Sequence, residues 1–306
     1  MSGAVAYGGS VAALSSAQEG EKKAVNTTYS RFTFGSEKPV LSPSEACKDR
    51  AATEQKIRAS AEKILRAFNT WSFKREQPSD AALMLKVIAD AVAARRGVPF
   101  VLYWGKGPRH RACSFETQCL DFLAALASRI AAVYPPGASI RLILTDTHAE
   151  HNGHSREDIR RYFDDVKAAA SQHGFETCWL GQLVKAAGIL ATAAPLEEAV
   201  PREMLRSLVA SARKWYRGPG SAEDGALTYL RMNLIEQRVV ERAFPQAIFV
   251  TFNGSELRPL FPRQLPIFYM YSLRRGVSVK PWFLPSEAEK LEPSADQTAT
   301  FHPGAG

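Results

Sequence analysis

The clearest hydrophobic pattern lies in the middle of the chain, where two short apolar runs flank a longer amphipathic stretch. The runs Val98–Trp104 and Ile140–Thr145 are rich in β-branched and aromatic residues, and Gly or Pro lies near each of them. Short, continuous apolar runs with such flanks favour buried parallel strands over pieces of helix. We therefore predict two buried parallel strands here.

The stretch between the two runs predicts an amphipathic helix, with Ser114 as its N-cap and Pro135–Gly137 as its end. Spacings of three and four place its apolar residues on one helical face: Phe115, Cys119, Phe122, Leu123, Leu126 and Ile130. Strands joined in this way are connected by a right-handed crossover, and open α/β sheets bind ligands beyond the carboxyl ends of their strands. The segments Gly105–Arg111 and Asp146–His154 should therefore face each other across a site.

The remaining pattern predicts more helices and strands around this unit. Helices are expected over Ser44–Phe68, Ser79–Arg96 with Ser79 as N-cap, Arg156–His173, Ala191–Tyr216 with a break near Pro201, and Leu227–Phe244. Strands are expected over Phe175–Leu180, Ile248–Phe252 and Leu265–Ser272. The last two suit a hairpin or a neighbouring pair at the sheet edge. The predicted class is α/β, a Rossmann-like, mostly parallel sheet flanked by helices, with a mixed edge from the C-terminal strands.

Composition divides the chain into three parts. Residues 1–43 are rich in Gly, Ala, Ser and Thr and show weak periodicity, which predicts a disordered tail. Residues 44–285 carry the periodic segments, and with 45% hydrophobic residues in the chain we expect a single α/β catalytic domain there. Residues 286–306 are expected to form a second disordered tail.

The chain is basic, with a formal net charge of +8 and a sequence pI of about 9.3. This balance suits nucleic acid, an anionic membrane or a phosphorylated small molecule as a partner. The cations are spread over the 306 residues without a long Lys or Arg run. A phosphorylated or carboxylated metabolite is therefore favoured, and nucleic acid is disfavoured.

Cysteine usage and hydropathy indicate a cytoplasmic protein. The four cysteines form no CxxC pair, which favours reduced thiols. No apolar run is long enough to span a bilayer, and the N-terminus lacks the charged and apolar regions of a signal peptide. We therefore expect no membrane partner.

The first candidate site is the basic segment Gly105–Arg111, directly after the first strand. Its two glycines let the backbone approach a ligand, and its cations suit a phosphate or carboxylate. The candidates for substrate binding are Gly105, Gly107, Arg109, His110 and Arg111. Lys106 is a catalytic candidate, because a lysine at the end of a hydrophobic strand can form an imine with a carbonyl. A solvated turn with ordinary surface charges is the alternative.

The second candidate site is the polar segment Asp146–His154, which the pattern predicts to be a loop. An Asp at the end of a buried strand suits an acid, a base or a metal ligand, and histidine titrates near neutral pH. We therefore predict that Asp146, His148 or both transfer protons. The alternatives are a capped loop before the next helix, with a capping box that starts at Ser155, and a metal site. The metal site would use His148, His151 and His154, although such a loop does not hold three imidazoles in a fixed geometry.

Two other groups are weaker candidates. Arg231, Glu236 and Arg238 could form salt bridges with one another on a solvated helix surface, and Arg231 and Glu236 could instead contact substrate. Aromatic residues near the C-terminus could line an apolar pocket, with Trp282 in contact with substrate, although such residues more often belong to the core. They are Phe268, Tyr269, Tyr271, Trp282 and Phe283.

The order of these segments resembles the isonitrile synthases, a family that includes the yeast-type dityrosine biosynthesis proteins. Three features carry the likeness: the strand PFVLYW ending in the Lys-bearing segment GKGPRHR, the helix running into Tyr134–Ala138, and the strand RLILTD ending in Asp. The later PQAIFV strand and the segment Lys280–Phe283 are similar to the second half of that family. The likeness spans about Val98–Pro285.

The resemblance implies an enzyme of natural-product biosynthesis that converts the amino group of an L-amino acid, or a related amine, to an isonitrile. Ribulose 5-phosphate would donate the carbon, and no metal or organic cofactor would take part. The resemblance also implies Lys106 as the loop lysine and Asp146 as the strand-end acid, with Arg109 or Arg111 near the phosphate. The partners would be these two small molecules, and a homodimer is compatible with the sequence.

Two other function classes stay open at this point. One is a metal-dependent enzyme that uses Asp146, His148, His151 and His154. The other is a basic protein that binds nucleic acid or phosphate without catalysis, although the chain has no basic stripe or recognised nucleic-acid motif.

Overall fold

The structure is a computed structural model that describes residues 43–105, 110–188 and 200–270. The chain divides into two units, Met1–Ala46 and Cys47–Gly306, and the elements below lie in the second unit apart from the first residues of helix α1. The predictions for the two tails, for the helical segment before Pro201 and for Trp282 fall outside the described residues.

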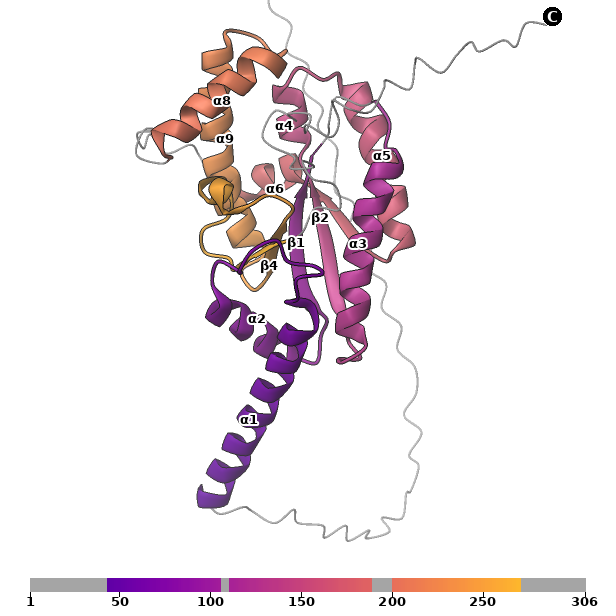
Figure 1. Cartoon of the computed structure of the whole chain (residues 1–306), viewed down its shortest axis with the longest axis vertical. Helices are drawn as coiled ribbons and strands as arrows, with labels where there is room; N and C mark the ends of the chain where they lie inside the picture. The colour runs from indigo at the N-terminus through magenta and orange to yellow at the C-terminus, as the bar shows by residue number, and fades with distance from the viewer. Residues whose placement is uncertain (1–42, 106–109, 189–199, 271–306) are drawn as a thin grey trace, which may run out of the picture. The chain divides into compact units, whose positions relative to one another are not determined.

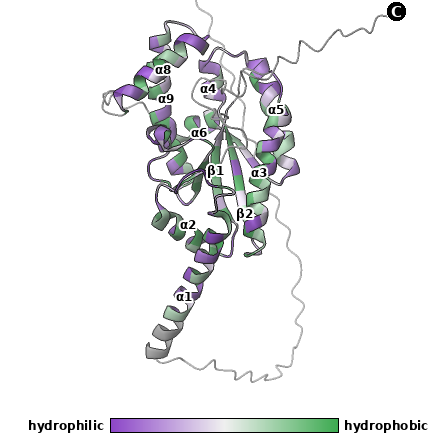
Figure 2. Cartoon of the chain, viewed as in Figure 1, coloured by the Kyte–Doolittle hydropathy of each residue, from purple (hydrophilic) through white to green (hydrophobic). Residues whose placement is uncertain are grey.

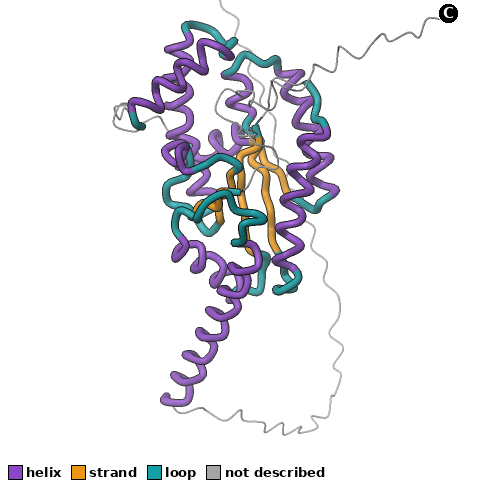
Figure 3. The backbone as a smooth tube through the Cα atoms, in the orientation of Figure 1, coloured by secondary structure: helices purple, strands orange, loops and turns teal. Residues whose placement is uncertain are grey.

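Five strands form one sheet in the order β3-β2-β1-β4-β5. Figure 1 labels β2, β1 and β4 of this sheet, and Figure 3 shows the strands in orange among the helices. The strands are β1 (Val98–Trp104), β2 (Ala138–Leu144), β3 (Glu176–Trp179), β4 (Ile248–Thr251) and β5 (Ile267–Tyr269). All four pairings between these described strands are parallel. The predicted fold class, a Rossmann-like α/β sheet flanked by helices, is confirmed.

Helices cover both faces of the sheet. One face packs against α1 (Pro43–Phe68), α2 (Ala81–Ala93), α3 (Ser114–Ala131) and α5 (Arg156–Gln172). The other face packs against α6 (Leu180–Ala187) and α9 (Ala222–Ala243), and α8 (Arg202–Trp215) packs on α9. The strands are apolar on both faces because both are buried: Phe100 and Leu102 belong to the first core, and Val101 to the second. Figure 2 shows the resulting hydrophobic strands and the mixed polarity of the helices around them.

The strand order reverses at β1, and this reversal positions the site. The chain leaves β1 toward β2 on one side, and β4 later returns to the other side of β1. The connections from neighbouring strands therefore diverge above the carboxyl ends of β1 and β4. In open α/β sheets a ligand binds in the crevice at such a point.

The C-terminal strands differ in part from the prediction. β4 and β5 form the expected neighbouring pair at the sheet edge, but they are parallel, so the hairpin and the mixed edge are wrong. The connection over residues 252–266, with the 3₁₀ helix η1 (Ser255–Leu260), is long enough for the crossover that a parallel pair requires. The antiparallel contact at this edge is one isolated bridge between Lys74 and Met270.

Helix starts follow capping chemistry, with two one-residue corrections. Asp80, and not Ser79, caps α2, because its carboxylate accepts a hydrogen bond from the Leu83 backbone N–H at 2.8 Å. Cys113 occupies the cap position of α3 in place of Ser114, and the Glu116 carboxylate accepts from the Cys113 N–H at 2.8 Å. The predicted cap at Ser155 is confirmed, with its hydroxyl accepting from the Asp158 N–H at 3.1 Å.

None of the helices in the described ranges is both long enough and apolar enough to cross a membrane.

Candidate active site

A cavity of about 90 Å³ lies at the reversal point of the sheet. β1 contributes Tyr103, and the end of β4 and the residues after it contribute Thr251 and Asn253. The short helix α4 (Asp146–His151) contributes His148, and α9 contributes Tyr229 and Asn233. Gly105 and His148, from the two segments that the sequence predicted to face each other, both line the cavity, and the contributions of β4 and α9 were not predicted.

A buried carboxylate–imidazole pair stands at this cavity. The Nε2 atom of His148 hydrogen bonds to the Glu236 carboxylate, and the Thr147 hydroxyl donates to the other carboxylate oxygen at 2.8 Å. The Glu236 side chain is 2% exposed and that of His148 is 12% exposed. Because a carboxylate accepts hydrogen bonds, the contact assigns the Nε2 proton to His148 and makes Nδ1 the basic ring nitrogen.

The segment that carries His148 is a helix and not the predicted loop. α4 follows β2 directly, and the preceding Thr145 is buried, with its hydroxyl donating to the Trp104 carbonyl at 3.2 Å. Ala149 on the inner side of α4 is fully buried in the core. These tertiary contacts hold a six-residue, mostly polar segment in a helix that would be too short to form alone.

Two tyrosines beside the pair keep their protons. Burial raises the pKa of Tyr103 and of Tyr229 well above the ordinary value, and the negative charge of Glu236 raises both further. The Tyr229 ring packs 5.1 Å from the His148 ring, measured between centroids. The cavity is therefore lined by neutral hydroxyl groups next to one buried carboxylate.

Some residues that line the cavity carry a buried polar atom without a hydrogen-bond partner among the described residues, and two such atoms bear on the site. They are the Tyr103 hydroxyl oxygen and the Asn152 Oδ1 atom, and Asn152 is only 7% exposed. Buried polar atoms are nearly always paired, so each exception needs an explanation. A polar ligand in the cavity would satisfy both atoms.

Asp146 lies at the start of α4, and one of its contacts is structural. Its Oδ1 atom accepts a hydrogen bond from the Gly181 N–H at 2.9 Å, which satisfies a donor in the first turn of α6. A Cβ atom on Gly181 would lie 2.8 Å from Asp146 Oδ2, so glycine permits this close approach. Asp146 does not contribute to the described cavity lining.

The other two histidines of the segment do not join His148. His151 Nε2 donates to the Gly225 carbonyl at 2.9 Å, and burial lowers the pKa of this imidazole. In residues 43–105, 110–188 and 200–270, no group of three or more His, Cys, Asp or Glu side chains is placed to hold a metal ion. The structure does not bring His148, His151 and His154 together in the arrangement that the metal-site alternative requires.

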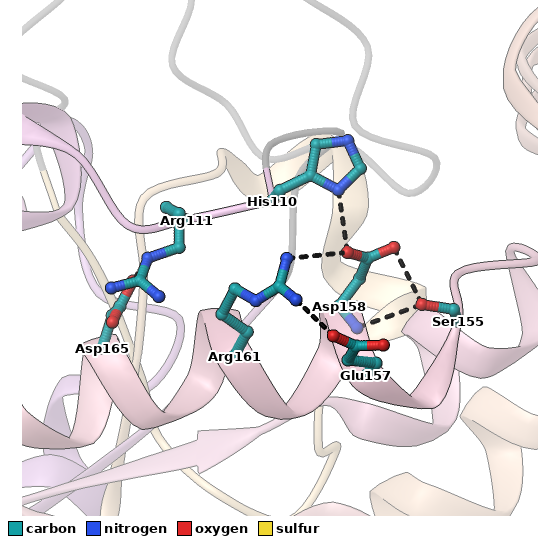
Figure 4. A network of polar contacts seen from close by, with 7 residues as sticks. All are labelled: His110, Arg111, Ser155, Glu157, Asp158, Arg161 and Asp165. Carbon is teal, nitrogen blue, oxygen red and sulfur yellow. Dashed lines mark hydrogen bonds and ion pairs between the residues drawn. The ribbon is translucent and has the colours of Figure 1, made fainter.

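The basic segment after β1 is described only at its two ends. Lys106, Gly107 and Arg109 lie outside the described residues, and Gly105 lines the cavity. His110 and Arg111 instead reach α5, as Figure 4 shows. His110 Nδ1 lies 2.9 Å from Asp158 Oδ1, and Arg111 Nε lies 2.9 Å from Asp165 Oδ2. Both side chains are exposed and contribute nothing to the described cavity lining, so these contacts match the surface-charge alternative.

The polar residues of α9 divide between two environments. Arg231 and Arg238 are exposed, as expected for a solvated helix face, but Glu236 is buried against α4. Its neighbours Asn233 and Gln237 are buried too, and the Gln237 amide donates to Asn233 Oδ1 at 2.8 Å. The signal in the sequence was the spacing of Tyr229, Asn233, Glu236 and Gln237, which places them on one helical face.

The chain has a fold similar to that of a known protein structure. The sequence matches no protein-family model and no curated protein. The crystal structure of the PvcA protein from Pseudomonas aeruginosa is similar, with a TM-score of 0.54 and 20% identity over 73% of this chain and 87% of that chain. At this identity the likeness shows the fold alone. A tyrosyl-tRNA synthetase from Archaeoglobus fulgidus, solved with L-tyrosine, gives a TM-score of 0.38 and 13% identity over 76% of this chain and 68% of that chain.

Proposed function

We propose that the chain is an isonitrile synthase-like enzyme that converts the amino group of an L-amino acid, or a related amine, to an isonitrile. Ribulose 5-phosphate would supply the carbon. The fold is similar to that of PvcA, and the sequence resembles the isonitrile synthases in the segments named above. The observation that carries the proposal is the buried His148–Glu236 pair beside a cavity at the reversal point of the sheet.

The pair suits the first step of such a reaction, the condensation of an amine with a ketone. The nitrogen lone pair attacks the carbonyl carbon, a C–N bond forms, and the carbonyl oxygen leaves as water to give an imine. The nitrogen must lose two protons, and the departing oxygen must gain two. The His148 Nδ1 atom can accept a proton from nitrogen and return it to oxygen, while Glu236 holds the ring and balances the charge of the imidazolium.

The phosphate of the sugar requires cations, and the basic segment is the proposed source. Gly105 lines the cavity, and residues 106–109 follow it directly in the sequence. We propose that Lys106 and Arg109 meet the phosphate or the carbonyl there. Asp146 is proposed to position α6 through Gly181 rather than to transfer protons.

The direct test is to incubate the purified full-length chain with ribulose 5-phosphate and the proteinogenic amino acids, and to search for isonitrile masses. Lys106→Ala should abolish product while the unfolding midpoint stays unchanged. Lys86→Ala is the matched control, because Lys86 is exposed on α2 and pairs only with Asp90 among the described residues. Absence of an isonitrile with every amine, from a folded protein, would reject the proposal.

The alternative function, binding of nucleic acid, can be tested with the same purified protein. Binding through the net positive charge should weaken steeply as salt rises, because phosphate contacts release counterions. A filter-binding assay with single-stranded and duplex DNA at low salt measures this, and no retention would remove the alternative.

A further inference from the structure

The inner wall of the cavity is built from aromatic rings that support one another. The Tyr103 and Phe249 rings lie 5.1 Å apart, and the Phe249 and Phe261 rings lie 5.6 Å apart. Phe249 is 1% exposed and Phe261 is 6% exposed, and both belong to the core under α9. Moving one ring would open a gap around the others, so this wall resists expansion.

The space inside this wall is small. The cavity holds about 90 Å³, whereas an apolar cavity that accepts benzene measures about 150 Å³. Ligand sites for larger molecules usually measure about 300–1,000 Å³. A phenyl or indole group therefore does not fit without displacing a wall residue, but a short aliphatic group does.

The polar part of the wall suits an amine. Asn152 Oδ1 is a buried acceptor without a partner among the described residues, and no Lys or Arg belongs to the described lining. The Glu236 carboxylate lies behind His148 and supplies a buried negative charge there. Oxygen acceptors beside a buried carboxylate attract an ammonium or amine N–H and repel a phosphate.

We infer that this cavity is the amine subsite of the enzyme and that it selects an amino acid with a compact side chain, such as alanine or serine, over tyrosine or tryptophan. The inference rests on the proposed function and narrows its substrate. The amine would donate to Asn152 Oδ1, and the short side chain would lie against Phe249 and Phe261. The carboxylate of the amino acid and the sugar phosphate, which the same negative charge repels, would then lie outside the cavity.

Two measurements test the inference, and the first does not depend on turnover. In calorimetric titrations of the full-length chain, L-alanine or L-serine should bind at least about tenfold more tightly than L-tryptophan. Asn152→Leu removes the acceptor and should weaken the binding of the preferred amino acid by about tenfold or more. Asn69→Leu is the matched control, because Asn69 Oδ1 also lacks a described partner but lies outside the cavity lining.

The second measurement is competition between amino acids in the isonitrile assay. The wild-type chain should convert the compact amino acids at least about tenfold faster than tyrosine or tryptophan. Leu257→Ala enlarges the cavity and should move the ratio toward larger side chains, whereas Leu183→Ala, in the same core but outside the lining, should not.

The outcomes distinguish the inference from the proposed function. If tyrosine or tryptophan is the preferred amine in binding or in turnover, the inference is wrong while the function stands. If compact amino acids bind through Asn152 but no isonitrile forms, the function is wrong while the amine subsite stands. If no amino acid binds the folded wild-type chain, the subsite is wrong as well.

Discussion

Two of the histidine–carboxylate pairs among the described residues lie in opposite surroundings. His148 and Glu236 join α4 to α9, with exposed fractions of 12% and 2% for their side chains. His110 and Asp158 join the basic segment to α5, with exposed fractions of 70% and 24% (Figure 4). Water and salt screen the second pair, whereas the first has exchanged water for fixed partners. The same two functional groups therefore form a buried pair suited to proton transfer in one place and an ordinary surface contact in the other.

The largest expected effect comes from removing the buried carboxylate. Glu236→Ala takes away the partner of His148 and Thr147, and it should lower the free energy of unfolding by about 3 kcal/mol. Glu236→Gln retains the shape but not the charge, so turnover should fall about 100-fold or more with a smaller loss of stability. Urea unfolding and the isonitrile assay measure the two effects. Near-normal turnover by the Gln variant would remove Glu236 from the proposed mechanism.

A smaller effect is expected at Asp146, which separates a structural role from a catalytic one. Asp146→Ala should cost about 1 kcal/mol, the usual loss for a carboxylate that satisfies a helix start. Asp146→Asn keeps an oxygen acceptor for the Gly181 N–H, so turnover should stay within a few-fold of the wild-type value. A large loss of turnover in a stably folded Asn variant would instead assign proton transfer to Asp146.

The surface pair should contribute less. His110→Asn or Asp158→Asn should change the free energy of unfolding by about 0.5 kcal/mol or less, because exposed ion pairs contribute little. Turnover should stay within about twofold, which makes Asp158→Asn the matched control for Glu236→Gln. If the surface variant impaired catalysis as strongly as the buried one, burial would not explain the difference between the two pairs.

The subtlest expected effect is a pH dependence at His151. Burial lowers the pKa of His151 in the folded chain below the ordinary value near 6.5, so the unfolded chain binds more protons. The contribution of His151 therefore favours folding less as pH falls from about 7 to about 5. His151→Gln keeps an N–H donor for the Gly225 carbonyl and should flatten that dependence. Denaturant titrations of both proteins across this range measure the slope, and equal slopes would contradict the prediction.

Elements with a strong local pattern were predictable from the sequence. β1 has the predicted bounds because seven apolar residues lie between Gly97 and Gly105. α5 starts where predicted because Ser155 can cap it. In both cases residues close in sequence determine where the element begins or ends, so the prediction does not require knowledge of tertiary contacts.

The candidate site was predictable only in part, because it depends on contacts between distant segments. The sequence pattern alone indicated His148 as a candidate. It did not predict helix α4, because α4 has no apolar periodicity and is held in place by burial of residues such as Ala149 in the core. Glu236 looked like a solvated residue because Arg231 and Arg238 lie near it in sequence. Its burial follows from how α9 packs against α4, and the parallel pairing of β5 follows from the path of the chain after β4.

The edge strand β5 has a consequence for how the protein is made. The backbone N–H groups of Arg75 and Ser79 donate to the carbonyls of Tyr269 and Ile267, and Lys74 bridges to Met270. This early segment covers the edge that β5 would otherwise offer to strands of other molecules. During translation β5 emerges from the ribosome almost two hundred residues after this segment, so the segment lacks its partner strand until then. Pauses in translation upstream of β5 would therefore prolong the aggregation-prone interval.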